Sequence, residues 1–336
     1  MTVTIRDVAK HAGVSIKTVS RVVNNEAFVR EATRAKVIRA IEELGYVVNV
    51  SAQRLARGRS YAIGLIYHDA SWHYISHVLR SVLETGLKAG YRTILQPYDA
   101  DRPNEYEEIL RLVTQRSVDG FIFTPPADNS PSLLDDLKSQ KIPFVRLTPK
   151  DRDCPWPYVT ATDRQGAYDM TRYLISQGHR RIGYIRGPLQ QKAGYDRFDG
   201  YKTALTEYGL KIDPNLVMQG DDYFEGGCLC AQTLLNISPR PTAIFANNDE
   251  MASGVLASAH RLGMAVPGEL SVVGFDDIPL SRQVWPALTP VRQPIRKIAE
   301  LATNLLIQIL EGEELDTFRH ELPTELIIRE STSPVN

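Results

Sequence analysis

The amino-acid sequence predicts two parts of different fold class, a small all-α head and a larger α/β core with two lobes. Within residues 5–44, apolar residues recur at helical spacing and glycines interrupt them, which is typical of short helices. After residue 60, short apolar runs alternate with amphipathic segments, and this alternation occurs twice. The repetition favours two doubly wound parallel sheets. A chain of 336 residues has room for two or three domains.

The head and the core differ in charge. The whole chain has 39 Lys and Arg against 40 Asp and Glu, for a formal net charge of -1. Residues 1–60 hold eleven basic and five acidic residues, or +6, which leaves -7 for the remainder. A basic head before an acidic core favours a protein whose head alone contacts a polyanion such as DNA.

Composition argues against several classes of protein. The first residues lack the basic and apolar regions of a secretory signal, and no stretch approaches roughly 18 consecutive apolar residues. Cys154, Cys228 and Cys230 form neither a disulfide framework nor a zinc pattern. We therefore expect a cytoplasmic protein with reduced thiols, no metal ion, no cofactor and no membrane partner.

Two short helices joined by a glycine-containing turn open the head, over residues 5–12 and 15–24. Gly13 ends the first, Ser15 can cap the second, and their apolar faces comprise Val8, Ala9 and Ala12, then Val19, Val22 and Val23. This is the pattern of a helix-turn-helix, whose second helix enters the major groove of DNA. The residues opposite the valines supply an apolar contact, two cations and a hydroxyl for base edges and phosphates, namely Ile16, Lys17, Ser20 and Arg21. The alternative is a surface helix with a few cations.

A third helix is predicted over residues 31–44. Gly45 would stop it, and we expect its apolar side chains to complete a three-helix core: Val37, Ile38, Ile41 and Leu44. The head would then span residues 1–46.

Residues 47–60 connect the head to the core. About two helical turns are possible over residues 50–57, but a helix this short is marginal by itself. Ala52 is small enough for close approach to a second copy, and Leu55 is suited to wedge between minor-groove base steps. A flexible linker with an incidental leucine is the alternative.

The core, residues 61–336, reads as two series of alternating strands and helices. In the first series we expect strands over 62–67, 93–96, 120–124 and 144–147, and helices over 76–89, 104–115 and 132–139. In the second we expect strands over 182–186, 216–219, 243–246 and 271–274, and helices over 165–177, 197–208, 226–235 and 250–262. The chain would cross between lobes near 158–162 and 288–295, with a last helix over 295–311 and a last strand over 322–329. The expected lobes are residues 61–159 with 292–319, and 162–289 with 321–332.

Several runs resemble the LacI/GalR family of bacterial transcription regulators. In the head and hinge these are residues 7–15 (DVAKHAGVS), 18–24 (TVSRVVN), 44–46 (LGY) and 49–56 (NVSAQRLA). In the core they are residues 178–182 (GHRRI), 187–188 (GP), 197–201 (RFDGY), 241–249 (PTAIFANND) and 271–277 (SVVGFDD). Three residues depart from the family pattern, namely Val48 for Pro, Gln53 for Arg and Arg30 for a Ser cap. The core of this family is similar to periplasmic sugar-binding proteins.

The resemblance implies roles for individual residues of the head and hinge. Ile16, Lys17 and Arg21 would read bases, and Leu55 would be the lever that the hinge helix inserts into the minor groove. Asn49 and Ala52 belong to the same hinge motif and are expected at the DNA. A homodimer on a palindromic operator follows from the family, and the absence of leucine heptads after the last strand favours a dimer over a tetramer.

Polar residues near the predicted strand ends of the second lobe are suited to a polyol. Arg197 can donate to two vicinal hydroxyls, Asp276 can accept from two, and Asn248 offers a donor and an acceptor. The resemblance favours ligand binding by Arg197 and Asp276 over a structural ion pair. For Asn248, a helix N-cap is an equally good interpretation, and the residue can serve both roles.

In the first lobe, a loop after the first strand offers aromatic rings. Trp72 or Tyr74 could stack on a sugar face, whereas His68 and His73 are expected at the surface. The remaining expected lining consists of Thr124, Thr148, Asp222, Tyr223, Phe224 and Gln293. The family often has Asp at the position of Thr148.

The resemblance implies a repressor of carbohydrate-utilisation genes, controlled by a mono- or disaccharide bound between the lobes. A purine- or nucleoside-responsive repressor of the same architecture is the alternative. A transporter's solute-binding protein has no use for the head, and an enzyme is disfavoured because no Gly-x-Gly-x-x-Gly after the first strand, Walker, G-x-S-x-G or H-E-x-x-H motif is present.

Overall fold

A computed structural model describes residues 3–23, 28–46, 59–68, 72–99, 102, 105–127, 130–153, 155–189 and 191–335. The chain divides into two compact units, Met1–Ser60 and Tyr61–Asn336. The hinge residues Asn49, Ala52 and Leu55 lie outside the described residues, so their expected roles stay predictions. Of the helices that the structure describes, none combines the length and the apolar character needed to cross a membrane.

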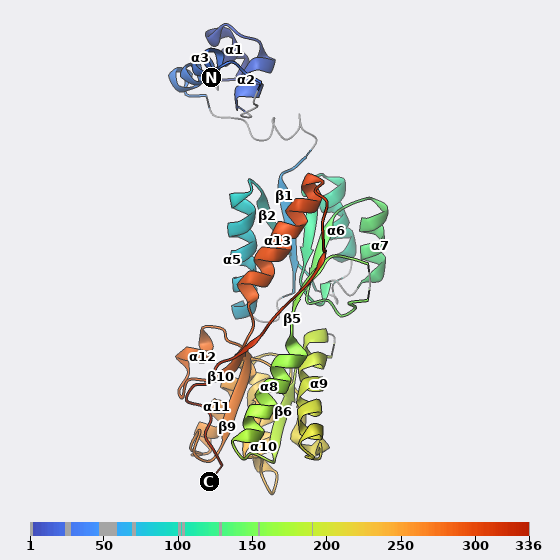
Figure 1. Cartoon of the computed structure of the whole chain (residues 1–336), viewed down its shortest axis with the longest axis vertical. Helices are drawn as coiled ribbons and strands as arrows, with labels where there is room; N and C mark the ends of the chain where they lie inside the picture. Colours follow the sequence, from blue (N-terminus) through green and yellow to red (C-terminus); the bar gives the residue numbers. More distant parts are fainter. Residues whose placement is uncertain are drawn as a thin grey trace. The chain divides into compact units, whose positions relative to one another are not determined.

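The first unit contains three helices, α1 (Ile5–Ala12), α2 (Ile16–Val23) and α3 (Glu31–Leu44) (Figure 1). Gly13 and Gly45 follow α1 and α3 with φ of 63° and 60°, a left-handed conformation that glycine adopts without steric cost. The Ser15 hydroxyl accepts a hydrogen bond from the Thr18 backbone N–H at 3.1 Å. The predicted stops and the predicted cap are therefore confirmed.

One valine from each helix forms the centre of this small core. Val8, Val19 and Val37 are fully buried. The prediction for Ile38 was wrong, because its side chain is 44% exposed and Ala40 is buried instead. Successive residues of a helix are rotated by about 100°, so Ile38 cannot share the inward face of Val37, whereas Ala40 can.

The first lobe of the second unit is a six-stranded parallel sheet in the order β11-β5-β4-β3-β1-β2. Its strands are β1 (Ala62–Tyr67), β2 (Arg92–Pro97), β3 (Gly120–Phe123), β4 (Phe144–Leu147), β5 (Tyr158–Ala161) and β11 (Arg319–Leu322). One apolar cluster joins the sheet to α5 (Trp72–Lys88) and α13 (Ile295–Glu311), and another joins it to α6 (Glu105–Thr114) and α7 (Pro131–Ser139). The two pairs of helices cover opposite faces of the sheet (Figure 1).

The second lobe is a six-stranded sheet in the order β12-β10-β9-β8-β6-β7, parallel except for β12. Its strands are β6 (Ile182–Arg186), β7 (Val217–Gln219), β8 (Ala243–Ala246), β9 (Ser271–Asp276), β10 (Thr289–Arg292) and β12 (Glu325–Leu326). One apolar cluster includes α8 (Asp163–Ser176) and α9 (Lys192–Glu207), and another includes α10 (Phe224–Asn236) and α11 (Asp249–Arg261). The short elements η2 (Pro214–Leu216) and α12 (Leu280–Gln283) complete this lobe.

Three crossings connect the two lobes. Residues 158–161 and 289–292, expected within crossings, are strands β5 and β10, so the crossings are only the short links that follow them. The predicted strand over 322–329 was wrong, because the segment divides into β11 of the first sheet and β12 of the second. The Thr324 backbone N–H donates to the Thr162 hydroxyl at 3.0 Å, which ties the third crossing to the first.

Candidate binding pocket and nucleic-acid interface

A pocket lies between the two lobes, at the carboxyl ends of the strands of both sheets. It has an empty volume of about 600 Å³, including its opening to solvent. Strand carboxyl ends are where α/β sheets bind ligands. The lining consists of His68, Tyr74, Ile75, Thr124, Pro125, Thr148, Gln191, Ala193, Arg197, Asp222, Asn247, Asn248, Asp276 and Gln293.

Arg197 lies in the second turn of α9 and is buried in the second-lobe wall. Its guanidinium donates to Asp163 at 2.9 Å, to the Asn247 carbonyl at 2.6 Å and to Asp276 at 3.2 Å. It also lies 3.8 Å from the centre of the Phe275 ring. Burial alone would lower the pKa of Arg197, but the carboxylates of Asp276 and Asp163 raise it above its ordinary value. Arg197 is therefore a fixed cation in an ion-paired network.

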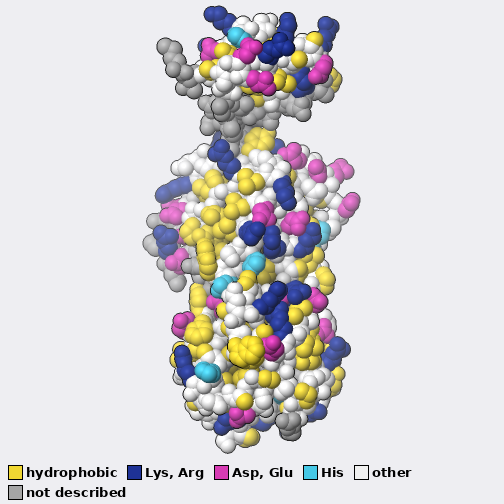
Figure 2. Space-filling view, turned by 90° about the vertical axis from the view of Figure 1, so that its left-hand side faces the viewer, with side chains coloured by type: hydrophobic (Ala, Val, Ile, Leu, Met, Phe, Trp, Pro, Cys, Tyr) yellow, Lys and Arg dark blue, Asp and Glu magenta, His cyan; other side chains and the backbone are white. Residues whose placement is uncertain are grey.

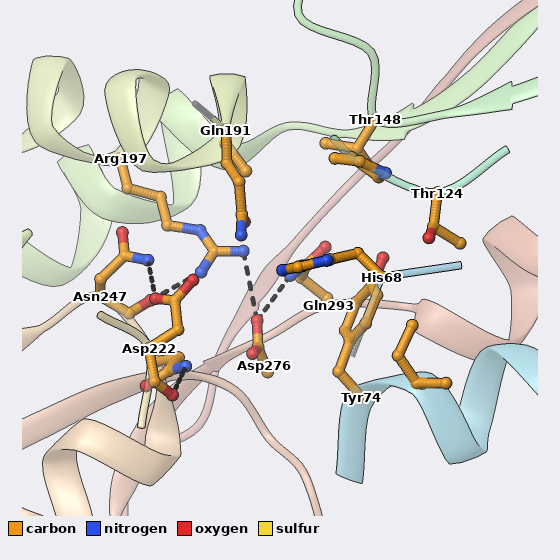
Figure 3. Close-up of a pocket in the computed structure, with 14 residues that line it drawn as sticks. His68, Tyr74, Thr124, Thr148, Gln191, Arg197, Asp222, Asn247, Asp276 and Gln293 are labelled. Atoms are coloured by element: carbon orange, nitrogen blue, oxygen red, sulfur yellow. Dashed lines mark hydrogen bonds and ion pairs between the residues drawn. The ribbon is translucent and has the colours of Figure 1, made fainter. Parts of the chain in front are cut away.

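Asp276 is the last residue of β9 and points its carboxylate into the pocket (Figure 3). Its Oδ1 accepts hydrogen bonds from Arg197 and from the Gln293 side chain, the latter at 2.6 Å. Among the described residues, no side chain or backbone group donates to Oδ2. Burial raises the pKa of Asp276 to about 7, against the opposing effect of Arg197. This carboxyl can therefore exchange a proton near neutral pH.

Asp222 forms a second carboxylate of the same wall. Its Oδ1 accepts from the Asn247 side chain at 3.0 Å, and burial raises the pKa of Asp222 to about 6. Gly187 allows this close arrangement, because a Cβ there would lie 2.3 Å from Asn247 Nδ2 and 2.9 Å from Asp222 Oδ1. Asn248 caps α11 by accepting from the Met251 N–H at 2.9 Å and donates to the Asp222 carbonyl at 2.9 Å. Its predicted capping role is confirmed.

Asp276 and the next residue have opposite environments. Asp276 and Asp277 have φ of 105° and 56°, so two consecutive non-glycine residues depart from the usual strand conformation. The Asp277 carboxylate accepts from Arg292 at 2.7 Å, from Ser281 at 2.8 Å and from Arg329. Burial alone would raise the pKa of Asp277, but these hydrogen bonds together lower it. The two carboxylates of this pair diverge, and Asp277 is the structural one.

The first-lobe wall is composed of hydroxyl and ring groups. Thr124 and Thr148 follow β3 and β4 directly, and Tyr74 lies in the first turn of α5. The pKa of Tyr74 is raised by burial and then by the negative charges of Asp276 and Asp163, so its hydroxyl stays protonated. In Figure 3, these side chains and His68 lie across the pocket from Arg197, Asp222 and Asn247.

The pocket brings together most of the residues expected to line it. Tyr74, Thr124, Thr148, Arg197, Asp222, Asn248, Asp276 and Gln293 line it, whereas Trp72, Tyr223 and Phe224 do not. Trp72 is 63% exposed, because α5 begins at residue 72 rather than 76 and a helix turns by about 200° between Trp72 and Tyr74. The expectation that His68 lies apart at the surface was also wrong.

Sequence reasoning missed His68, Gln191 and Asn247 as lining residues. His68 and Asn247 immediately follow β1 and β8, so their position at a strand end was an available signal. Gln191 had no such signal, because α9 begins at residue 192 and not at the predicted residue 197.

The exposed side of α2 is the candidate nucleic-acid interface. Its apolar face, Val19 and Val22, is buried against the head core, whereas Ile16 is 45% exposed and Lys17 and Arg21 are exposed. Ser20 is half-buried between them. Because all four belong to one short helix beside a glycine turn, they form a continuous surface with an apolar end and two cations, which is the composition that major-groove readout requires.

Comparison with known proteins identifies similarities over nearly the whole chain. Residues 4–49 match the model of the lacI family of bacterial regulatory proteins, and residues 171–332 match that of the periplasmic binding protein-like domain. The ribose operon repressor of Halalkalibacterium halodurans is 35% identical over 98% of this chain and 97% of its own length. The HTH-type transcriptional repressor PurR of Proteus mirabilis is also 35% identical, over the same shares of the two chains. A solved structure of the lac repressor dimer bound to operator and the anti-inducer ONPF superposes with a TM-score of 0.86, at 28% identity over 99% of this chain and 100% of that one.

Proposed function

The chain belongs to the LacI family of bacterial regulatory proteins, and on this premise we propose that it represses carbohydrate-utilisation genes under the control of a sugar. The sugar binds between the two lobes and changes the affinity of the protein for its operator. The observation that carries this proposal is the convergence of hydroxyl-binding groups from both lobes on one pocket, with Arg197, Asp222 and Asp276 at its centre.

The pocket has the chemistry that vicinal hydroxyls require. A carboxylate accepts from two adjacent hydroxyl groups, and the guanidinium and amide groups donate to the oxygens that remain. Asp276 and Asp222 supply such carboxylates, and Arg197, Asn247 and Gln293 supply donors around them. Tyr74 offers a ring for the apolar face of a sugar.

The head would place α2 in the major groove. Ile16 contacts a thymine methyl, Lys17 and Arg21 contact guanine edges or phosphates, and Ser20 donates or accepts at a neighbouring base. Asn49, Ala52 and Leu55 contribute minor-groove contacts by the family resemblance.

A second copy of the chain is proposed to cover an apolar groove on the second lobe. The groove includes Leu256 and Ala257 of α11, Leu280 of α12, Val284 and Trp285, and Trp285 is 84% exposed. Figure 2 views the side of the second unit on which α5, α11 and α12 lie, and shows apolar side chains gathered on it. The solved lac repressor structure is a dimer, and a palindromic operator requires two heads.

A purine- or nucleoside-responsive repressor is the second candidate. The similarity to PurR favours it. The distribution of aromatic rings in the lining favours a sugar. A nucleobase is best held between two rings on opposite walls, whereas the rings of this lining, His68 and Tyr74, both belong to the first lobe.

A thermal-shift screen of the full-length protein separates the two candidates. We expect a mono- or disaccharide to raise the melting temperature, because a ligand that binds the folded state stabilises it by mass action. The same sugar should change the dissociation constant for an operator selected from random-sequence DNA. Stabilisation by a nucleobase or nucleoside, with no response to any sugar, would reject the sugar proposal.

A further inference from the structure

We infer that the ligand of the interlobe pocket carries no anionic group, so that the pocket accepts an uncharged sugar and rejects its phosphorylated counterpart. This inference rests on the proposed function and deepens it by fixing the charge class of the effector. It follows from the balance of charges and of hydrogen-bond donors around the pocket.

Acidic groups outnumber basic groups in the buried network. Asp222 and Asp276 line the pocket, and Asp163 lies directly behind Arg197. Among the described lining residues, Arg197 is the only Lys or Arg. Three buried carboxyl groups thus surround one guanidinium, and a ligand anion would add further negative charge in a region where charges are poorly screened.

The guanidinium of Arg197 is already paired with protein carboxylates. Its Nε donates to Asp163 at 2.9 Å and its Nη2 donates to Asp276 at 3.2 Å. Its Nη1 donates to the Asn247 carbonyl. A phosphate would have to compete with these bonds for the same cation. A ligand hydroxyl can accept from one of the Arg197 N–H groups that these three hydrogen bonds do not use. It can also donate its own hydrogen to a carboxylate.

The pocket also presents an acceptor that a ligand can satisfy. No described residue donates to Oδ2 of Asp276, because Arg197 and Gln293 both donate to Oδ1. A hydroxyl group can supply such a hydrogen, whereas a phosphate or carboxylate group has acceptors alone when ionised. An anionic group placed beside Oδ2 of Asp276 would therefore be repelled and would leave this oxygen without a donor.

The N-termini of α8 and α11 do not provide a substitute for a cation. α11 is capped by Asn248 and has Asp249 and Glu250 in its first turn, and α8 begins with Asp163. The first turn of α9 has no acidic residue, but Lys192 in that turn is paired with Asp196. The positive ends of α8 and α11 are thus already offset by carboxylates.

Matched pairs of ligands test the inference directly. Ribose and ribose 5-phosphate, glucose and glucose 6-phosphate, and adenosine and AMP are screened by thermal shift with the full-length protein, and any pair that responds is titrated by calorimetry. We expect the uncharged member to bind and the phosphorylated member to bind at least about tenfold more weakly. Equal or tighter binding of a phosphorylated member overturns the inference, and so does a panel in which no uncharged member stabilises the protein.

Two variants connect the discrimination to the pocket charge. Asp222→Asn removes one negative charge from the lining and should narrow the affinity ratio between the two members of a pair. Asp135→Asn makes the same change in charge on an exposed position of α7 and should leave the ratio unchanged. An unchanged ratio in Asp222→Asn overturns the inference. Binding of glucose 6-phosphate in preference to glucose would leave the sugar proposal intact, whereas a response to adenosine alone would reject that proposal and keep the inference.

Discussion

Two adjacent carboxyl groups at the end of β9 have different roles because of their immediate neighbours. Asp276 faces the pocket and has a raised pKa, whereas Asp277 faces Arg292 and Arg329 and has a lowered pKa. The unusual φ of both residues directs the two side chains apart. One residue is therefore available to a ligand, and the other holds the strand end, β10 and the C-terminal segment together.

Replacement of Asp276 by Asn should weaken effector binding without unfolding the protein. Asn tolerates unusual φ better than most residues and keeps an acceptor, but it loses the charge-assisted hydrogen bonds. We expect the effector dissociation constant to rise about 10- to 100-fold, measured by calorimetry. An affinity within twofold of the wild type would show that Asp276 does not contact the ligand.

The stability of the ligand-free protein should depend on pH through Asp276. Its folded-state pKa of about 7 exceeds the ordinary value of 3.8, so between these values the folded state keeps a proton that the unfolded state has lost. Its contribution to the free energy of unfolding is therefore complete below about pH 4 and is lost as the pH rises through 7. The charged groups that face it are Arg197 on α9, Asp222 after β7, Asp163 on α8 and Asp249 on α11.

Calorimetric melting at several pH values checks this dependence. In the wild type, the melting temperature should decline between about pH 4 and 7, and Asp276→Asn should make this decline smaller. The variant should keep part of the decline, because burial also raises the pKa of Asp222 to about 6. An identical pH profile in the variant and the wild type would contradict the assignment of the proton to Asp276.

Loss of the Asp277 charge should destabilise the fold. Asp277→Asn keeps the backbone preference but leaves the mostly buried Arg329 without its carboxylate, at an expected cost of about 3 kcal/mol in the free energy of unfolding. It also removes one of the two carboxylates that pair with Arg292. Asp169→Asn, which breaks a solvent-exposed pair with Arg172, should cost at most about 0.5 kcal/mol. Urea denaturation measures both, and equal costs would contradict the structural role of Asp277.

Helix and strand positions were predictable from the sequence more reliably than their ends. Gly13 and Gly45 stop their helices as expected, and the apolar run of β1 was found with its correct bounds. The starts of α5 and α9 were placed four and five residues too late, because polar and aromatic residues in a first turn give no apolar periodicity. For this reason Trp72 was assigned to the pocket and Gln191 was missed.

The strand ends explain why most of the pocket was predictable. Thr124 ends a predicted strand, and Thr148 and Asn248 follow predicted strands by one or two residues, relations that the sequence alone reveals. Gln293 was expected in the pocket from its place in a crossing, and the structure puts it directly after β10. The partners of Arg197 were not predictable, because Asp163 and Asn247 are brought to it by the packing of α8 and β8 around α9. The division of the last segment into β11 and β12 also depends on which sheet has a free edge.

Helix α2 should determine sequence preference at the operator. Arg21→Ala is expected to weaken operator binding and to relax base preference at one position of each half-site, at a cost of about 1 to 3 kcal/mol in binding free energy. Arg39→Ala removes the same charge from an exposed position of α3 and should leave base preference unchanged. Fluorescence anisotropy with the selected operator and single-base variants gives both values. Retention of the full base preference by Arg21→Ala would reject its assigned role.

At the scale of the whole molecule, dimerisation is expected to depend on the groove around Trp285. Trp285→Asp places a charge on an apolar surface that a second copy would bury, so it should shift the protein toward monomers in sedimentation velocity. Tyr208→Asp, on an exposed aromatic residue that follows α9 and does not line this groove, serves as the control. A Trp285→Asp protein that remains dimeric at the same concentration would place the interface elsewhere.

The proposed regulation requires that the sugar and the operator influence each other. Because the binding free energies form a closed cycle, a sugar that changes operator affinity by some factor must have its own affinity changed by the same factor when the operator is bound. Through this reciprocity, ligand binding in the acidic two-lobed core and DNA binding by the basic head are thermodynamically coupled. The coupling does not require the two units to share a fold or a sign of charge.

The most direct test is the operator dissociation constant of the full-length protein, measured by fluorescence anisotropy with and without a saturating sugar that stabilises it. We expect a change of about 5- to 150-fold, and no change in Asp276→Asn at the sugar concentration that saturates the wild type. An operator affinity that is the same with and without the bound sugar would contradict the central claim that the pocket controls DNA binding.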